Sequence, residues 1–374
     1  MEIVQVDTQR KADVKRFIRL PFRIYQRSQQ WVPPIEMDVR LQLNQRKHPY
    51  YQHSDADFFL AVQGGEDVGR ISVLENRNYN SYRGERTAFF YHFECVQDPS
   101  VGQALFDRAF EWARARGLTK VIGPKGMGVF DGMGMLVEGF EHRAAMTMMA
   151  YNPPYYPQYA EAAGFEKEVD FVSCHLKAEQ FTLPERVHSI ADRVKARGSL
   201  RVVTFRNKRE LRAMASKIGK TYNETFVDNW EYVPVTDAEL DLVVNDLLTV
   251  ADPKLIKVIM HEDDVVGFLF AFPDLSAAIQ RQRGRLFPFG IIDLLLEYRR
   301  TKWVILNGAG ILPQFQGRGG NALLYSEMEK TIKSTDFVHA DLTQIAESAV
   351  QMRRDLENLG GIPYKNHRVY RRYL

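Results

Sequence analysis

Cysteine is scarce in this chain of 374 residues, which contains only Cys95 and Cys174. Neither lies in a Cys-x-x-Cys pair or in a Cys/His spacing typical of a metal site, so the sequence predicts no bound metal and no redox pair. A small disulfide-stapled scaffold is excluded as well. A reducing compartment, the cytoplasm, fits this cysteine usage best.

Long apolar runs and an excess of one charge sign are also missing. The longest apolar run, residues 286–296, contains a proline and an aspartate and is too short for a bilayer, which takes about 20 residues. Lys and Arg total 50 against 47 Asp and Glu, which gives a net charge of +3 without long blocks of one sign. We therefore predict no membrane span and no nucleic-acid partner.

What is present is an ordinary globular composition, with 45% hydrophobic and 26% charged residues, and a repeat. Trp31 and Trp230 are each followed closely by proline, at an offset of 199 residues. Gly69 and Gly267 each stand in a predicted β-hairpin, at an offset of 198. These matches predict a duplicated fold, with chance similarity between generic α/β patterns as the alternative.

The duplication predicts an α/β fold with mixed sheets, built as two tandem domains over residues 1–183 and 184–374. A predicted helix entry at Pro184 marks the boundary. Each half carries an insertion. Residues 123–145 are glycine-rich but match no nucleotide-binding template, so an acceptor-contacting loop and a structural loop both stay open. Residues 275–300 are basic at their ends and apolar inside; an acyl tunnel, a dimer contact, a membrane contact and burial in its own domain are the alternatives.

A strand, a glycine-rich loop and an amphipathic helix follow one another in the second half. Pro313 ends the strand, glycines occupy positions 317, 319 and 320, and Arg318 adds a positive charge. The uncovered amides of such a loop lie at the positive end of the helix dipole, where a phosphate or pyrophosphate binds well. A tight turn that only caps a helix is the alternative.

The string from Gln316 to Asn321 resembles motif A of the GNAT superfamily of acyl-CoA-dependent N-acyltransferases, Gln/Arg-x-x-Gly-x-Gly/Ala. Gln316 and Gly319 match the pattern, whereas Asn321 stands where glycine or alanine is expected. The resemblance implies a GNAT-like fold in each half, with acetyl-CoA or another acyl-CoA as co-substrate. It implies no metal.

In that family the fourth strand bulges and splays from the fifth, and pantetheine binds the exposed backbone. Residues 308–310 suit such a bulge, and strand five would cover residues 337–342. The resemblance thus implies a cofactor-binding set made of Gly310, Ile311, Leu312, Gln316, Gly317, Arg318, Gly319, Gly320 and Asn321. Plain core packing is the alternative for Ile311 and Leu312.

The first half carries an altered version of the loop, Gln97-Asp-Pro-Ser-Val-Gly102. Ser100 aligns with the central glycine, Asp98 would repel a pyrophosphate, and Pro99 lacks an amide donor. We therefore predict one acyl-CoA site, in the second half.

Residues for the chemistry are less clearly marked. Acyl transfer to an amine needs a proton acceptor and a proton donor. The family's usual tyrosine and asparagine positions hold Leu356 and Ala349. Glu224, as a base, and Tyr325 are the catalytic candidates. The substrate-binding candidates are Asn223, Trp230 and Tyr232, with helix packing and a solvated cap as the alternative.

These observations predict direct transfer of an acyl group, most simply acetyl, to an amine of a small molecule or peptide. Two alternatives remain open. One is a non-catalytic acyl-CoA-binding or scaffolding protein with the same fold. The other is a Fem-type aminoacyl transferase, which pairs two such folds but resembles this sequence less because no helical arm interrupts either half.

Overall fold

The computed structural model describes residues 1–374 except 129–130, 146–148, 178–181, 228, 231 and 359. Two compact units are present. The N-terminal unit comprises Met1–Val172, Leu275–Glu297 and Lys365–Leu374, and the C-terminal unit comprises Ser173–Asp274 and Tyr298–Tyr364. The predicted domain boundary at 183/184 divides the chain into two sequence repeats, whereas these units are defined by contacts, so that boundary stays a prediction.

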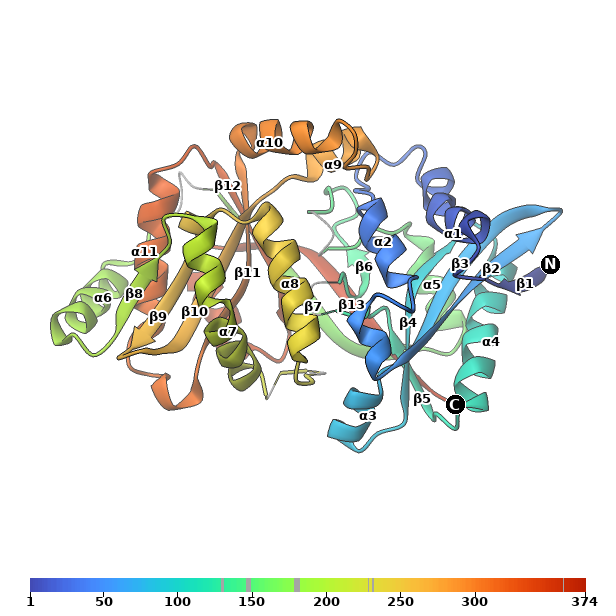
Figure 1. Cartoon of the computed structure of the whole chain (residues 1–374), viewed down its shortest axis with the longest axis horizontal. Helices are drawn as coiled ribbons and strands as arrows, with labels where there is room; N and C mark the ends of the chain where they lie inside the picture. The colour runs from blue at the N-terminus through green and yellow to red at the C-terminus, as the bar shows by residue number, and fades with distance from the viewer. Residues whose placement is uncertain (129–130, 146–148, 178–181, 228, 231, 359) are drawn as a thin grey trace. The chain divides into compact units, whose positions relative to one another are not determined.

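The N-terminal unit is built on a mixed sheet (Figure 1). Its strands run in the order β1-β2-β3-β4-β5-β13, and β6 also pairs with β13. Its strands and helices are β1 (Glu2–Gln5), α1 (Lys11–Ile24), α2 (Glu36–Gln42), β2 (Asp55–Gln63), β3 (Glu66–Glu75), α3 (Arg77–Arg83), β4 (Thr87–Cys95), α4 (Pro99–Ala115), β5 (Lys120–Gly123), β6 (Met135–Glu138), α5 (Tyr155–Ala162) and α9 (Ser276–Gln282).

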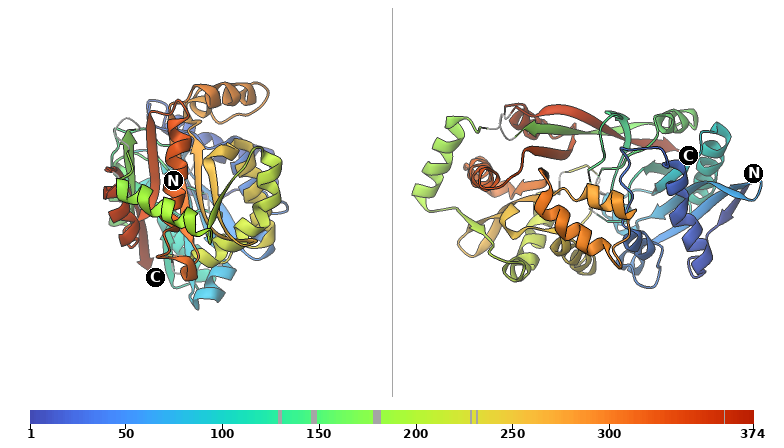
Figure 2. Two further views of the ribbon diagram at one scale, coloured as in Figure 1. Left: turned by 90° about the vertical axis from the view of Figure 1, so that its left-hand side faces the viewer. Right: turned by 90° about the horizontal axis from the view of Figure 1, so that it is seen from above.

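The C-terminal unit repeats this plan with the order β7-β12-β11-β10-β9-β8. Helices α6 and α11 pack on one face of its sheet and α7 on the other, beside α8 (Figure 2). Its elements are α6 (Glu185–Arg197), β8 (Arg201–Thr204), α7 (Lys208–Thr225), α8 (Asp237–Val250), β9 (Ile256–His261), β10 (Asp264–Pro273), β11 (Trp303–Ile311), α11 (Gly320–Lys333), β12 (His339–Ala346) and α12 (Val350–Asn358). Strands β7 (Glu166–Lys177) and β13 (Ile362–Tyr373) and helix α10 (Gly290–Arg300) contribute residues to both units.

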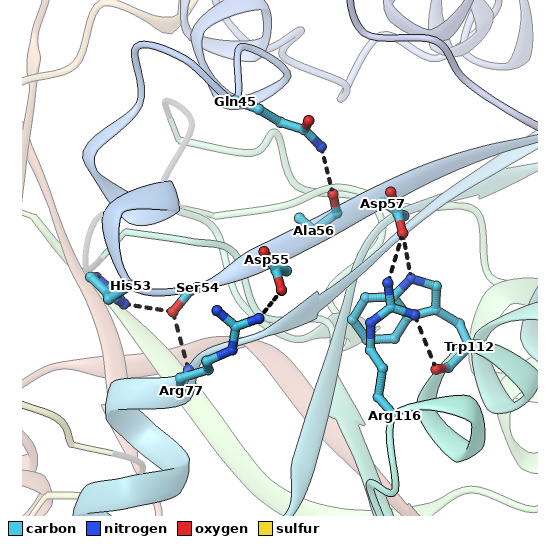
Figure 3. Close-up of polar contacts among 9 residues, drawn as sticks. All are labelled: Gln45, His53, Ser54, Asp55, Ala56, Asp57, Arg77, Trp112 and Arg116. Carbon is cyan, nitrogen blue, oxygen red and sulfur yellow. Dashed lines mark hydrogen bonds and ion pairs between the residues drawn. The ribbon is translucent and has the colours of Figure 1, made fainter.

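The apolar pattern of the sequence explains these elements. Helix α4 buries Leu105, Phe106 and Phe110 against the N-terminal sheet. Its C-terminal end is tied to β2, because Asp57 accepts hydrogen bonds from Trp112 Nε1 at 2.7 Å and from the Arg116 guanidinium at 3.2 Å (Figure 3). The helix is therefore fixed at one end, which sets the position of its N-terminus.

A buried ion pair joins β7 to β13 within the N-terminal unit. Asp170 accepts hydrogen bonds from Arg368 at 2.8 and 2.9 Å and from Asn366 at 3.2 Å. Burial alone would raise the pKa of Asp170, but these donors, with Lys167, lower its pKa to about 2. The ionised carboxylate is thus favoured in the folded protein.

We expect Asp170→Asn to lower the free energy of unfolding at pH 7 by about 2 kcal/mol, because a pKa shift of one unit corresponds to about 1.4 kcal/mol. Since the folded pKa is depressed, this contribution is present above pH 4 and is lost as the pH falls toward 2. Denaturant unfolding of both proteins across that window measures the difference. Asp107→Asn, at an exposed position of α4, is the control. A constant difference between pH 7 and 2 would contradict the prediction.

Candidate functional site

The C-terminal sheet opens between its two parallel strands β11 and β12. Residues Trp303–Leu306 of β11 pair with His339–Leu342 of β12. Among the described residues of the two strands, the pairing ends there. Opposite β10, the register of β11 shifts between Leu306 and Ala309, and Gly308 between them has φ +101°. The predicted bulge is confirmed. Strand β12 starts two residues later than predicted and runs to Ala346.

Glycine is required at two positions of this strand for different reasons. Gly308 adopts a backbone conformation that is costly for other residues. At Gly310 a Cβ atom would lie 2.4 Å from Thr225 Cγ2, so helix α7 packs directly on the strand there. Beyond the bulge, β11 no longer pairs with β12, while Leu312 N still donates to the Val266 carbonyl of β10 at 2.9 Å.

The glycine-rich loop connects this strand to α11. Gln316 folds back so that its Nε2 donates to the Ile311 carbonyl at 3.1 Å. Gly317 and Gly319 have φ +72° and +87°, and Gly319 is the N-cap of α11 without a side chain to cap the first turn. Arg318 is exposed and lies 5.0 Å from the centre of the Phe315 ring. The first-turn amides and one cation therefore suit an anion such as a diphosphate.

Helix α6 borders this loop. A Cβ at Gly319 would lie 2.7 Å from Val194 Cγ2 and 2.9 Å from Ile190 Cγ2. Any side chain at Gly319 would therefore displace α6, besides meeting an unfavourable φ. Asn321, in contrast, is exposed on the first turn of α11.

The corresponding helix of the N-terminal unit is capped by its own carboxylate. Asp98 is the N-cap of α4, and it accepts hydrogen bonds from Ser100 N at 2.9 Å and Ser100 Oγ at 2.7 Å. These bonds from Ser100 lower the pKa of Asp98. The two helices can be aligned by their N-cap residues, Asp98 in α4 and Gly319 in α11. Ser100 then corresponds to Asn321, so the predicted alignment of Ser100 with Gly319 is wrong.

Tyrosines cover the equivalent strand end in the N-terminal unit. Strands β4 and β5 pair only over Thr87–Phe89 and Lys120–Ile122, and β4 then bulges at His92, with φ +49°. At the strand end, Cys95 N donates to Tyr156 Oη at 2.8 Å, and Cys95 O accepts from Tyr155 Oη at 2.9 Å. Tyrosines thus bind both backbone groups of Cys95, whereas at Ile311, the corresponding residue of β11, the carbonyl accepts from Gln316 Nε2.

Two of the predicted acceptor residues stabilise a loop. Asn223 donates to the Val235 carbonyl at 3.2 Å and accepts from Val235 N at 3.0 Å, and Tyr232 Oη donates to the Asn223 carbonyl at 2.6 Å. Trp230 is half-buried in the same loop. Glu224 is exposed on α7 and lies 3.9 Å from Lys220. Asn223 and Tyr232 therefore hold this loop in place by hydrogen bonds, and their role in substrate binding stays a prediction.

Tyr325 lies on the α11 side of the sheet, packed against the core formed with α6. Its hydroxyl contacts Met352 Sδ of α12 at 3.7 Å. Burial, and to a lesser extent Asp355, raises the pKa of Tyr325 well above its usual value, so the hydroxyl keeps its proton. A proton donor, rather than a base, is the chemistry open to it.

A polar cluster on the opposite face was not predicted. His175 Nε2 and His339 Nδ1 lie 3.1 Å apart, and Trp303 stacks on His339 with ring centres 4.4 Å apart. Beside them the buried carboxylate of Asp341 accepts a hydrogen bond from Tyr364 Oη. Residues 304, 306 and 340 pack with α11, so the alternating residues Trp303, His339 and Asp341 face away from it. The five side chains come from four strands, β7, β11, β12 and β13.

Within the described residues, no group of His, Cys, Asp and Glu has the arrangement of a metal site, and no helix is long and apolar enough to cross a bilayer.

Comparisons with known proteins agree with this architecture. No protein-family model matches the chain. It is 29% identical, over 100% of its length and 98% of the relative's, to a protein named bacterial ceramide synthase from Caulobacter vibrioides (strain NA1000 / CB15N). It is 26% identical to protein YghO of Escherichia coli (strain K12), over 97% of this chain and 94% of that one.

Two solved structures extend the likeness to the fold. A tandem GNAT protein from the clavulanic acid biosynthesis pathway aligns with TM-score 0.57 and 13% identity, over 100% of this chain and 98% of that one. A GCN5-related N-acetyltransferase from Sphaerobacter thermophilus gives 0.52 and 12%, over 100% and 95%. The predicted fold is thereby confirmed: the chain has the α/β fold of tandem GNAT proteins.

Proposed function

We propose that this protein is an acyl-CoA-dependent N-acyltransferase whose donor site lies in the C-terminal unit. The contrast between the two units carries the proposal. In the N-terminal unit a carboxylate caps the helix and two tyrosines bind the strand end. In the C-terminal unit the same helix start and strand end carry glycines instead.

The residues of this site fit the parts of a CoA thioester. Gly317 to Asn321 would hold the diphosphate with first-turn amides, aided by Arg318. The backbone of Gly310, Ile311 and Leu312 would hold pantetheine beside the bulge. Bound acyl-CoA supplies a thioester carbonyl, to which the amine nitrogen forms a C–N bond while the C–S bond breaks and CoA leaves as a thiol.

The acceptor and the acyl chain follow from the relative named bacterial ceramide synthase. A ceramide is the amide of a fatty acid with a long-chain amino alcohol. Because the likeness covers both chains almost completely, we favour a long-chain acyl-CoA over acetyl-CoA as the donor. A lipid amine is then the acceptor, rather than a peptide.

Two groups compete for the role of proton acceptor. The amine must lose a proton as the C–N bond forms. The His175–His339 pair faces away from α11 at the first paired position of β11 and β12, three residues, or about 10 Å, before the strands separate. Glu224 stays the alternative, although its exposure to solvent favours it less. Tyr325 is our candidate for donating a hydrogen bond to the leaving sulfur, since its raised pKa keeps the hydroxyl protonated.

Incubation with palmitoyl-CoA and a long-chain amino alcohol in mixed micelles should release CoA thiol and form the amide, detected by mass spectrometry. We expect acetyl-CoA with the same acceptor to react at least about tenfold more slowly, which corresponds to about 1.4 kcal/mol in the transition state. Thermal stabilisation by acyl-CoA with no turnover on any amine would instead support a non-catalytic binding protein.

Asn321→Asp should change stability and donor affinity in opposite directions. A carboxylate in the first turn of α11 interacts favourably with the helix dipole and should stabilise the fold by about 0.3–1 kcal/mol. The same charge should repel the diphosphate and weaken acyl-CoA binding about tenfold, or about 1.4 kcal/mol. Denaturant unfolding and isothermal titration measure the two effects.

Ser100→Asp is the matched control, because Ser100 occupies the same position in α4. Its acyl-CoA affinity should stay within a factor of about three. A large loss of affinity in this variant, with none in Asn321→Asp, would show that the donor binds the N-terminal unit.

Replacing His339 by Gln tests the proton acceptor. We expect kcat to fall at least about 100-fold, the lower range for loss of a general base, while acyl-CoA affinity is unchanged. His188→Gln, on α6, is the control histidine. If Glu224→Gln lost activity and His339→Gln did not, the base would be Glu224.

A further inference from the structure

Helix α10 presents its apolar side to solvent. Ile292 and Leu295 are 56% and 64% exposed, and Ile291 and Leu296 are exposed beside them. At 100° per residue these four side chains fall on one side of the helix. Figure 2 shows α10 at the surface. The preceding turn adds Phe287 and Phe289, which are 64% and 70% exposed.

The acidic residues of the same helix point inward. Arg281 of α9 binds Asp293 at 2.8 Å and Glu297 at 2.6 Å, and Gln282 donates to Asp293 at 2.9 Å. The side chains of Asp293 and Glu297 are only 17% and 13% exposed. An ordinary surface helix has the reverse arrangement, with charges outside and apolar residues inside.

The hairpin formed by α9 and α10 is firmly held in the N-terminal unit. Glu36 N donates to the Gly284 carbonyl at 2.8 Å, and Gln280 Nε2 donates to the carbonyls of Gln29 and Trp31 at 3.0 and 2.9 Å. Leu294 packs on the inner side against a small core that contains Ile279. The apolar face is therefore displayed by a fixed scaffold.

The charges around this face are positive. Residues 281–300 contain five arginines (281, 283, 285, 299 and 300) and two acids (293 and 297), which gives +3, as much as the whole chain. Arg281 pairs with both acids, and Arg285 lies 3.6 Å from Glu36, so Arg283, Arg299 and Arg300 contribute most to the positive charge of this segment. A second copy docked on the same face would bring like charges together, whereas anionic lipid headgroups would complement them.

We propose that α10 and the turn before it form a surface that docks on an anionic lipid bilayer. The helix has 11 residues, so it would lie in the interface with its apolar side among the acyl chains rather than cross the bilayer. Phe287 and Phe289 would enter the same layer. This inference goes beyond the proposed function and does not depend on it.

Co-sedimentation of the full chain with phosphatidylcholine vesicles, with and without phosphatidylglycerol, tests the surface. We expect binding to the anionic vesicles that weakens at high salt. The variant Ile292→Asp/Leu295→Asp should bind at least about tenfold more weakly. Met37→Asp, at another exposed apolar position of the same unit, should bind like the unaltered protein.

A second variant guards against misfolding. Arg299→Glu/Arg300→Glu leaves the apolar residues in place and should abolish the preference for anionic vesicles. Failure of the unaltered protein to bind anionic vesicles, or equal binding by all variants, would overturn the proposal. Dissociation of a dimer by Ile292→Asp/Leu295→Asp, without vesicle binding by the parent, would assign the face to a second copy instead. The vesicle assay contains neither acyl-CoA nor an amine, so its outcome is independent of catalysis. If the protein bound anionic vesicles but showed no turnover in the separate acyl-transfer assay, only the proposed function would be contradicted.

Discussion

Unpaired backbone at the end of a splayed strand is the constraint on which the rest of this structure depends. Buried backbone N–H and C=O groups must be hydrogen-bonded, and a parallel pair that separates after four residues leaves such groups without a neighbouring strand. Each unit meets this requirement differently. The N-terminal unit supplies tyrosine hydroxyls at Cys95, whereas the C-terminal unit supplies the Gln316 amide at the Ile311 carbonyl and, in our proposal, a ligand at the rest of this edge.

The tyrosines of the N-terminal unit belong to a buried polar network, and displacing any of its members would leave a buried carboxylate with fewer hydrogen-bond partners. Tyr25 and Tyr156 donate to Glu94 at 2.6 and 2.8 Å, and the Arg70 guanidinium lies 3.9 Å from the same carboxylate. Burial raises the pKa of Glu94, while Arg70 and the two tyrosines oppose the rise. A pantetheine could enter only by displacing partners of a buried carboxylate, which costs several kcal/mol. In this unit, internal hydrogen bonds thus hold the strand end.

The sequence predicted the parts of the site that are continuous in the chain. Glycines at 308 and 319 signal a bulge and a bare helix start because few other residues tolerate those backbone conformations. The match of Ser100 to Gly319 failed for a physical reason. One residue separates Val96 from the helix cap Asp98, but six separate Leu312 from Gly319, and a difference in loop length cannot be recognised from a short motif. The His175–His339 pair could not be found this way, since pairing of β7 with β12 depends on sheet order.

The insertion at residues 275–300 could not be interpreted from composition, because its role also depends on contacts between residues that are separate in the sequence. Residues 275–300 have the apolar and basic content of several kinds of segment, and the decisive fact is which side of α10 carries which residues. Arg281 decides it, because its two ion pairs turn Asp293 and Glu297 inward and so rotate the apolar side outward. Exposed ion pairs contribute little to stability, but this arginine bridges two carboxylates that are largely shielded from water. The ion pairs of Arg281, the Gln282 bond to Asp293 and the packing of Leu294 on the inner side together orient the helix.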